Sequence, residues 1–242
     1  MIFPNLPGCI SRYIYEIAAI VVISILCLLV FIFFPRYAGY YDIKLFPQLK
    51  IFEETGIKDD VLDEAKKDMT KIKNFFSWVT NPEILCAPLI YIDRPAKLEW
   101  EDGKSEQQNI EVHISSSVTT PIYKVLSQID GLCYAYVLKL NKQTDLTREN
   151  TECDILANEC ITCHIPLTIQ KRKKVGVSVS ENEKYYTNIP ILFDSSRPHA
   201  FLNRSYQDVF VLCLGITRPP QINAKLSEVK LDAKKIIQFF DQ

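Results

Sequence analysis

The sequence predicts an α+β fold, in which a single N-terminal transmembrane helix precedes a mostly antiparallel, sandwich-like β domain flanked by two amphipathic helices. Three observations predict this fold. Residues 17–34 form an uncharged apolar run that ends at Pro35, and short β-rich runs separated by turn residues fill the middle of the chain. Apolar residues recur at helical spacing on both sides of those β-rich runs.

We interpret 13–36 as an uncleaved signal-anchor that follows a short N-terminal tail over 1–12. The apolar run corresponds to a helix of about 27 Å, close to the ~30 Å hydrocarbon core of a bilayer. It is longer than the ~7–15 apolar residues of a secretory signal, and it ends in bulky aromatic residues instead of a small-residue cleavage site. Tyrosines on both sides suit the two membrane interfaces. The predicted location is a membrane that the chain crosses once.

The distribution of Lys and Arg and the number of cysteines favour opposite membrane topologies. Arg12 precedes the run and Arg36, Lys44 and Lys50 follow it, a count that favours a cytoplasmic C-terminal part. Six cysteines beyond the run and a glycosylation sequon at Asn203 instead favour an oxidising compartment. We therefore expect the bulk of the chain to be an exoplasmic glycoprotein domain at an extracellular, lumenal or virion surface.

After the anchor, a connector over 37–57 is interrupted by Pro47 and Gly56. An amphipathic helix is predicted over 58–80, because acidic residues suit its first turn and the residue before Pro82 leaves helical space. A β-rich domain is predicted over 81–218, and a second amphipathic helix over 219–242 after Pro219 and Pro220. The β-rich runs that we interpret as strands are 87–92, 110–115, 122–126, 133–140, 161–169, 175–179, 189–193 and 209–214.

Each predicted helix carries an apolar stripe. Such stripes are typical of ordinary core packing, and two or three heptads are too few for a sustained coiled coil. The alternative is that a stripe docks a partner subunit or lies on the membrane surface. The interaction-stripe candidates are Leu62, Met69, Phe76, Ile222, Leu226, Val229, Ile236 and Phe240.

The cysteines beyond the anchor are an even set, which in an oxidising compartment indicates disulfides with fifteen possible connectivities. The disulfide candidates are Cys86, Cys133, Cys153, Cys160, Cys163 and Cys213. Two alternatives remain open. Cys160-Ile161-Thr162-Cys163-His164 matches the haem-attachment pattern, and Cys153, Cys160, Cys163 and His164 are chemically suited to zinc.

Composition and motifs exclude several function classes. The chain has 28 basic and 29 acidic residues, so it has no general nucleic-acid footprint. It contains no Gly-x-Ser-x-Gly, no His-Glu-x-x-His and no Gly-rich phosphate loop. Cys133 or Cys213 with His113 or His199 could form a thiol–imidazole pair, but both cysteines lie in apolar runs, which favours buried, inert thiols.

The sequence therefore predicts a non-enzymatic, membrane-anchored interaction or structural protein without a cofactor. Its expected partners are the lipid bilayer and other protein subunits of a viral envelope, cell surface or membrane complex, with no nucleic acid. The alternative is a membrane-tethered zinc, haem or redox protein that uses Cys153, Cys160, Cys163 and His164. We identify no family whose motifs the chain carries.

Overall fold

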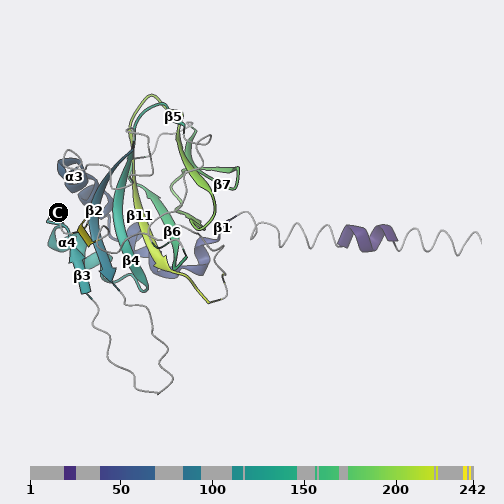
Figure 1. Cartoon of the computed structure of the whole chain (residues 1–242), viewed down its shortest axis with the longest axis horizontal. Helices are drawn as coiled ribbons and strands as arrows, with labels where there is room; N and C mark the ends of the chain where they lie inside the picture. Colours follow the sequence, from purple (N-terminus) through teal and green to yellow (C-terminus); the bar gives the residue numbers. More distant parts are fainter. Residues whose placement is uncertain are drawn as a thin grey trace, which may run out of the picture. The chain divides into compact units, whose positions relative to one another are not determined.

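The structure is a computed structural model. It describes residues 19–25, 39–68, 84–93, 111–116, 118–145, 156, 158–168, 174–220, 222, 237–238 and 240. The chain divides into two compact units, Met1–Ala38 and Gly39–Gln242. All the strands described belong to the second unit (Figure 1).

The described residues of the first unit, 19–25, are helical. Within the described residues, no helix has the length and apolarity needed to cross a membrane. The predicted transmembrane helix over 13–36 is therefore corrected, together with the single-pass, signal-anchor and exoplasmic assignments. The other residues of 13–36 lie outside the described part of the chain.

The second unit contains a seven-stranded sheet in which every neighbouring pair is antiparallel. In spatial order its strands are β1 (Tyr40–Tyr41), β9 (Ile191–Phe193), β6 (Cys160–Pro166), β11 (Val209–Thr217), β4 (Leu132–Leu140), β2 (Ile84–Asp93) and β3 (Glu111–Ile114). The β6 strand is an interior strand of this sheet. Its His164 is paired with Cys213 of β11 on one side and with Ile191 of β9 on the other.

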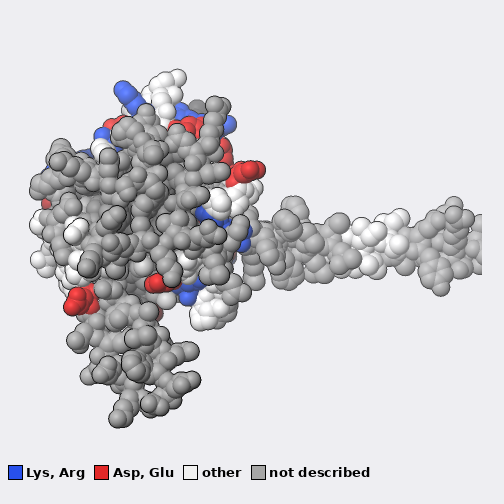
Figure 2. All heavy atoms as spheres, in the orientation of Figure 1, with Lys and Arg blue, Asp and Glu red and all other residues white. Residues whose placement is uncertain are grey.

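A second, four-stranded sheet is also antiparallel throughout. Its spatial order is β5 (Thr144–Asp145), β10 (His199–Asn203), β7 (Val175–Val179) and β8 (Asn182–Tyr185). Arg204 connects three of these strands, because its guanidinium donates to Asp145 at 2.7 Å and to Glu183 at 2.6 and 3.0 Å. In Figure 2, acidic and basic side chains accordingly lie next to one another on this part of the surface.

The two sheets pack against each other through an inter-sheet cluster of buried residues. The seven-stranded sheet contributes Tyr134, Tyr136 and Phe193 among others, and the four-stranded sheet contributes Val177 and Phe201. Because side chains alternate along a strand, β7 and β11 give this cluster every second residue, Val175, Val177 and Val179 from β7 and Val209, Val211 and Cys213 from β11. The inter-sheet cluster is therefore where side chains of the two sheets meet.

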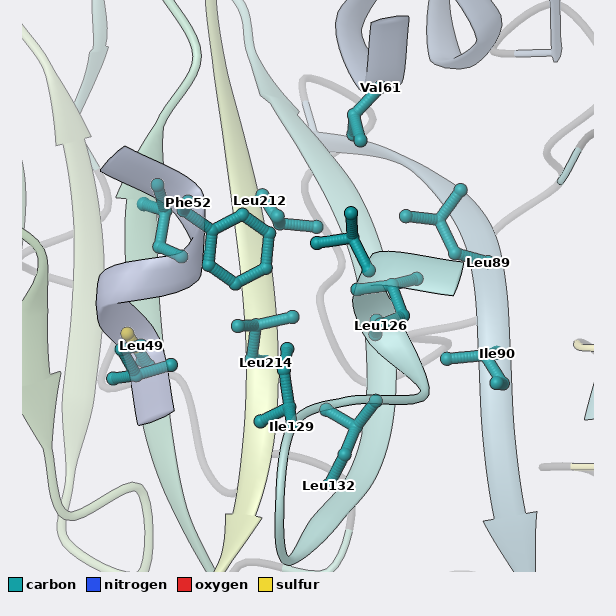
Figure 3. Packing of buried hydrophobic residues seen from close by; sticks show 14 of the residues in the cluster. Leu49, Phe52, Val61, Leu89, Ile90, Leu126, Ile129, Leu132, Leu212 and Leu214 are labelled. Carbon is teal, nitrogen blue, oxygen red and sulfur yellow. The ribbon is translucent and has the colours of Figure 1, made fainter. Parts of the chain in front are cut away.

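The other face of the seven-stranded sheet is covered by short helices. They are η2 (Ile43–Leu45), η3 (Pro47–Lys50), α2 (Ile51–Glu54), α3 (Lys58–Asp68) and α4 (Thr120–Leu126). Figure 3 shows Leu49 of η3 and Phe52 of α2 against Leu212 and Leu214 of β11. This helical layer separates the outer face of the sheet from solvent.

Two predicted elements differ from the structure for local reasons. Residues 122–126 were expected to be a strand but form most of α4, because Pro121 occupies the first turn and the buried Ile122, Val125 and Leu126 lie on one helical face. The helix expected over 58–80 is described as α3, which has Asp59 and Asp60 in its first turn, while 69–80 lies outside the described residues.

The predicted fold class is corrected as a whole. The second unit is built mostly of antiparallel β sheets with few helices, and the transmembrane element of the prediction has no counterpart in the described residues. Of the helix expected over 219–242, the structure describes only 219–220, 222, 237–238 and 240.

Candidate metal-binding site

The β6 strand separates the residues of the Cys-x-x-Cys-His motif onto its two faces. Cys160 belongs to the inter-sheet cluster, whereas Cys163 belongs to the core under the helical layer. His164 alternates with Cys163 and so shares the inter-sheet face with Cys160. The motif therefore cannot direct both thiols and the imidazole at one haem or one zinc ion. Burial also raises the pKa of the Cys163 thiol, which keeps it protonated and unsuited to metal coordination.

The predicted disulfides are corrected as well. Among the described residues, no two cysteines lie at disulfide bonding distance. Cys86, Cys133, Cys160, Cys163 and Cys213 are each buried in a strand. A strand fixes both the spacing and the direction of its side chains, so sequence proximity did not bring these thiols together. Cys153 lies outside the described residues.

Two histidines from different sheets meet instead. His164 of β6 is fully buried, and His199 of β10 is 5% exposed. The His164 ring lies 4.8 Å from that of Phe193 and 5.5 Å from that of Phe201, measured between centroids. The His199 ring lies 5.5 and 5.7 Å from the same two rings. The two imidazoles therefore share one aromatic environment inside the inter-sheet cluster.

The Nδ1 atom of each imidazole has a hydrogen-bond partner. Nδ1 of His164 is 2.7 Å from the Tyr186 hydroxyl oxygen, and Nδ1 of His199 is 3.0 Å from the Arg197 carbonyl oxygen. A carbonyl oxygen only accepts, so Nδ1 of His199 carries a proton, and in the neutral ring Nε2 then carries the lone pair. This is the arrangement of metal-ligating histidines, which use one ring nitrogen for the metal and donate from the other.

Nε2 of His164 is buried and has no hydrogen-bond partner among the residues that the structure describes. A buried polar atom in that state costs roughly 1–3 kcal/mol, so an unpartnered one calls for an explanation. Burial lowers the pKa of His164 to about 3, and the electrostatic effect of the nearby His199 is a second, smaller cause. His164 is therefore neutral at physiological pH, the form that binds a metal ion.

A buried ion pair fixes the turn that leads from Phe193 to His199. Asp194 is fully buried and accepts a hydrogen bond from the Arg218 guanidinium at 2.7 Å and from the Ser196 backbone N–H at 3.1 Å. The Arg218 guanidinium also donates to the Cys160 carbonyl at 3.0 Å, which ties the turn to the start of β6. Arg218 thus links the start of β6, the strand of His164, to the turn that precedes β10, the strand of His199.

The other predicted site residues lie elsewhere. His113 lies on β3, with Nε2 3.9 Å from Glu111 and its ring stacked on Tyr91. Cys213 is paired in register with His164 of β6.

Asn203, the glycosylation candidate, is fully buried at the end of β10. Its side-chain amide donates to the carbonyl oxygens of Leu140, Asn141 and Gln207 at 2.9–3.0 Å. An amide nitrogen enclosed in this way is not accessible for glycan attachment in the folded protein. The sequon is a structural turn between β10 and β11.

Three of the interaction-stripe candidates pack into the second unit itself. Leu62 and Phe240 are buried, and Ile222 packs against the core under the helical layer. Phe240 stacks on Tyr91 with 5.5 Å between ring centroids. The remaining candidates, Met69, Phe76, Leu226, Val229 and Ile236, lie outside the described residues.

Sequence reasoning missed His199 and Tyr186 as partners of His164. The strand β10 was not predicted, because Pro198 and the Asn203-Arg204-Ser205 turn leave only a short segment between them. The one usable signal is that His164 and His199 are two of only three histidines, and each lies among apolar and aromatic residues.

No protein-family model matches the chain, and no curated protein is significantly similar to it.

Proposed function

We propose that the protein binds a divalent transition-metal ion between Nε2 of His164 and Nε2 of His199, and acts through the open coordination positions of that ion. The observation that carries this proposal is the buried Nε2 of His164, which has no partner within the described part of the chain and lies near a second oriented imidazole. A metal ion is the partner that would satisfy this nitrogen without a proton donor. Neutral imidazole is a good ligand for iron, copper, nickel and zinc ions.

The donor set favours a reactive site over a structural one. Structural zinc sites are closed by four protein ligands, whereas catalytic sites leave positions open for water or substrate. No group of three or more His, Cys, Asp or Glu side chains placed to hold a metal is found among the described residues. Two imidazoles would therefore leave several positions open. A bound ion there would supply Lewis-acid polarisation or an activated water.

Electrostatics indicate the class of ligand that would complete the site. Two neutral imidazoles do not compensate the charge of a divalent cation, and burying uncompensated charge is costly. The described members of the inter-sheet cluster are apolar, aromatic or thiol side chains. The open positions thus favour a small anion, such as a carboxylate or hydroxide. This makes a metal-dependent enzyme the function that the geometry supports best.

The proposed site differs from the two functions predicted from sequence. It keeps His164 from the predicted metal cluster but replaces the three cysteines with His199. The non-enzymatic interaction protein stays a prediction, because no described contact tests partner binding.

Metal titration of the full chain tests the proposal. Metal-stripped protein is titrated with Co²⁺, Zn²⁺ and, without oxygen, Fe²⁺, and binding is followed by calorimetry and by Co²⁺ absorption. We expect one equivalent per chain, and His164→Ala and His199→Ala each to weaken binding by more than ~100-fold, above the ~10–100-fold range of outer-shell changes. His113→Ala is the matched control and should bind like the wild type.

Circular dichroism confirms that each variant is folded before titration. Equal metal affinity in wild type and both site variants would contradict the proposal, as would a wild-type chain that binds none of the three metals.

A further inference from the structure

We propose that Tyr186 is a positioning residue of this site, which fixes the ring orientation of His164. The inference rests on the proposed function and adds a residue that does not touch the metal. Tyr186 follows β8, and its hydroxyl oxygen lies 2.7 Å from Nδ1 of His164. Its ring centroid is 5.9 Å from that of His164, with the planes tilted by 52°.

The backbone holds Tyr186 where its hydroxyl can reach His164. The Tyr186 N–H donates to the Val175 carbonyl at 2.7 Å, which extends the pairing of β7 with β8 by one residue. A tyrosine side chain has only two rotatable χ angles, so an anchored backbone leaves the hydroxyl little freedom. The position of the hydroxyl is therefore set by the four-stranded sheet, while His164 belongs to the seven-stranded sheet.

The hydrogen bond also suits the metal-bound form of His164. Nε2 can coordinate only if it carries a lone pair, and the ring proton then resides on Nδ1. From there it can be donated to the Tyr186 hydroxyl oxygen, 2.7 Å away. Without the hydroxyl, Nδ1 of the metal-bound ring would be a buried donor with no described acceptor, and the ring would lose the contact that orients it.

The two histidines differ in how they are oriented. His199 donates to a backbone carbonyl, that of Arg197, which no side-chain substitution removes. His164 depends on a side-chain hydroxyl, and this contact can be deleted by removing one atom. Outer-shell partners of this kind typically change metal affinity by about 10–100-fold.

The test is metal titration of Tyr186→Phe in the full chain. We expect its affinity for Co²⁺ and Zn²⁺ to fall by about 10–100-fold and the Co²⁺ absorption bands to shift, because the ring of His164 is less constrained. Tyr134→Phe is the matched control. It deletes a buried tyrosine hydroxyl of the same inter-sheet cluster, which lies 3.2 Å from Thr162 Oγ1, and should keep both affinity and spectrum.

A second measurement needs no variant. Histidine ¹⁵N spectra of the zinc-loaded wild type should show His164 protonated at Nδ1, with its Nε2 resonance shifted by the metal. Failure of the wild type to bind metal would overturn the proposed function and this inference together. Wild-type binding with an unchanged Tyr186→Phe affinity and spectrum would overturn the role of Tyr186 alone, whereas His164 protonated at Nε2 in the zinc-loaded protein would overturn both proposals.

Discussion

At the scale of single residues, the structure reassigns the chemistry that the sequence suggested. The Cys-x-x-Cys-His motif is real in sequence, but strand alternation places Cys163 on the opposite face of β6 from Cys160 and His164. The spacing of the cysteines in sequence suggested a metal site. Which side chains lie on the same face depends on the conformation of β6, which the spacing alone does not give. The candidate from sequence that we keep in the proposed site is His164.

Asn203 provides a prediction at this scale. Its side chain donates to three carbonyls, and its Oδ1 accepts from the Ser205 N–H at 3.1 Å. Asn203→Ala would leave several buried backbone groups unsatisfied, so we expect a loss of more than ~1–3 kcal/mol in the free energy of unfolding. Urea denaturation measures this. Asn182→Ala, which removes one exposed hydrogen bond to Ser180, is the control and should change stability little.

At the scale of elements, what could be predicted depended on the residues of the segment. The long apolar runs that form β4 and β11 were identified from composition and alternation. The five-residue β7 was identified too, because its valines alternate. The equally short β10 was not, because it lies between Pro198 and the Asn203-Arg204-Ser205 turn, and it carries His199.

A glycine on β11 leads to a prediction about sheet packing. A Cβ added at Gly215 would lie only 2.1 Å from the ring of Tyr134, which is fully buried in the neighbouring strand. Gly215→Ala must displace that ring, and we expect a loss of about 1–3 kcal/mol, as for other overpacked cores. Thermal unfolding checks this result.

Gly56 offers the control for that substitution. An added Cβ there would meet nothing within 4 Å, and asparagine tolerates its φ of +65°. Gly56→Asn should therefore unfold close to the wild type. An equal loss in both variants would show that the ring of Tyr134 is not the reason.

At the scale of the whole second unit, a buried ion pair connects segments that are far apart in sequence. Burial alone would raise the pKa of Asp194, but hydrogen bonds from Arg218 and Ser196 and the charge of Arg218 outweigh it and hold the pKa below its ordinary value. The pair could not be read from sequence, because Asp194 and Arg218 belong to different turns that only the sheet brings together.

This pKa shift predicts an acid dependence of stability. A carboxyl group with a lower pKa in the folded state stabilises the fold above its unfolded pKa of about 3.9, and this contribution is lost as pH falls through the folded pKa. Wild type should lose more stability than Asp194→Asn between neutral pH and pH 2, because the variant has no carboxylate to protonate. Urea unfolding at both pH values measures the difference. Equal losses would contradict the prediction.

The placement of one imidazole in each sheet has a mechanical consequence. An ion held by both would cross-link β6 to β10, so separation of the two sheets would require breaking a coordination bond as well as exposing apolar surface. The fraction of chains with a bound metal ion would then determine how often the two sheets separate. Amide protons of the four-stranded sheet would report the state of the metal through their exchange with solvent, including those of β5 and β8, which carry neither histidine.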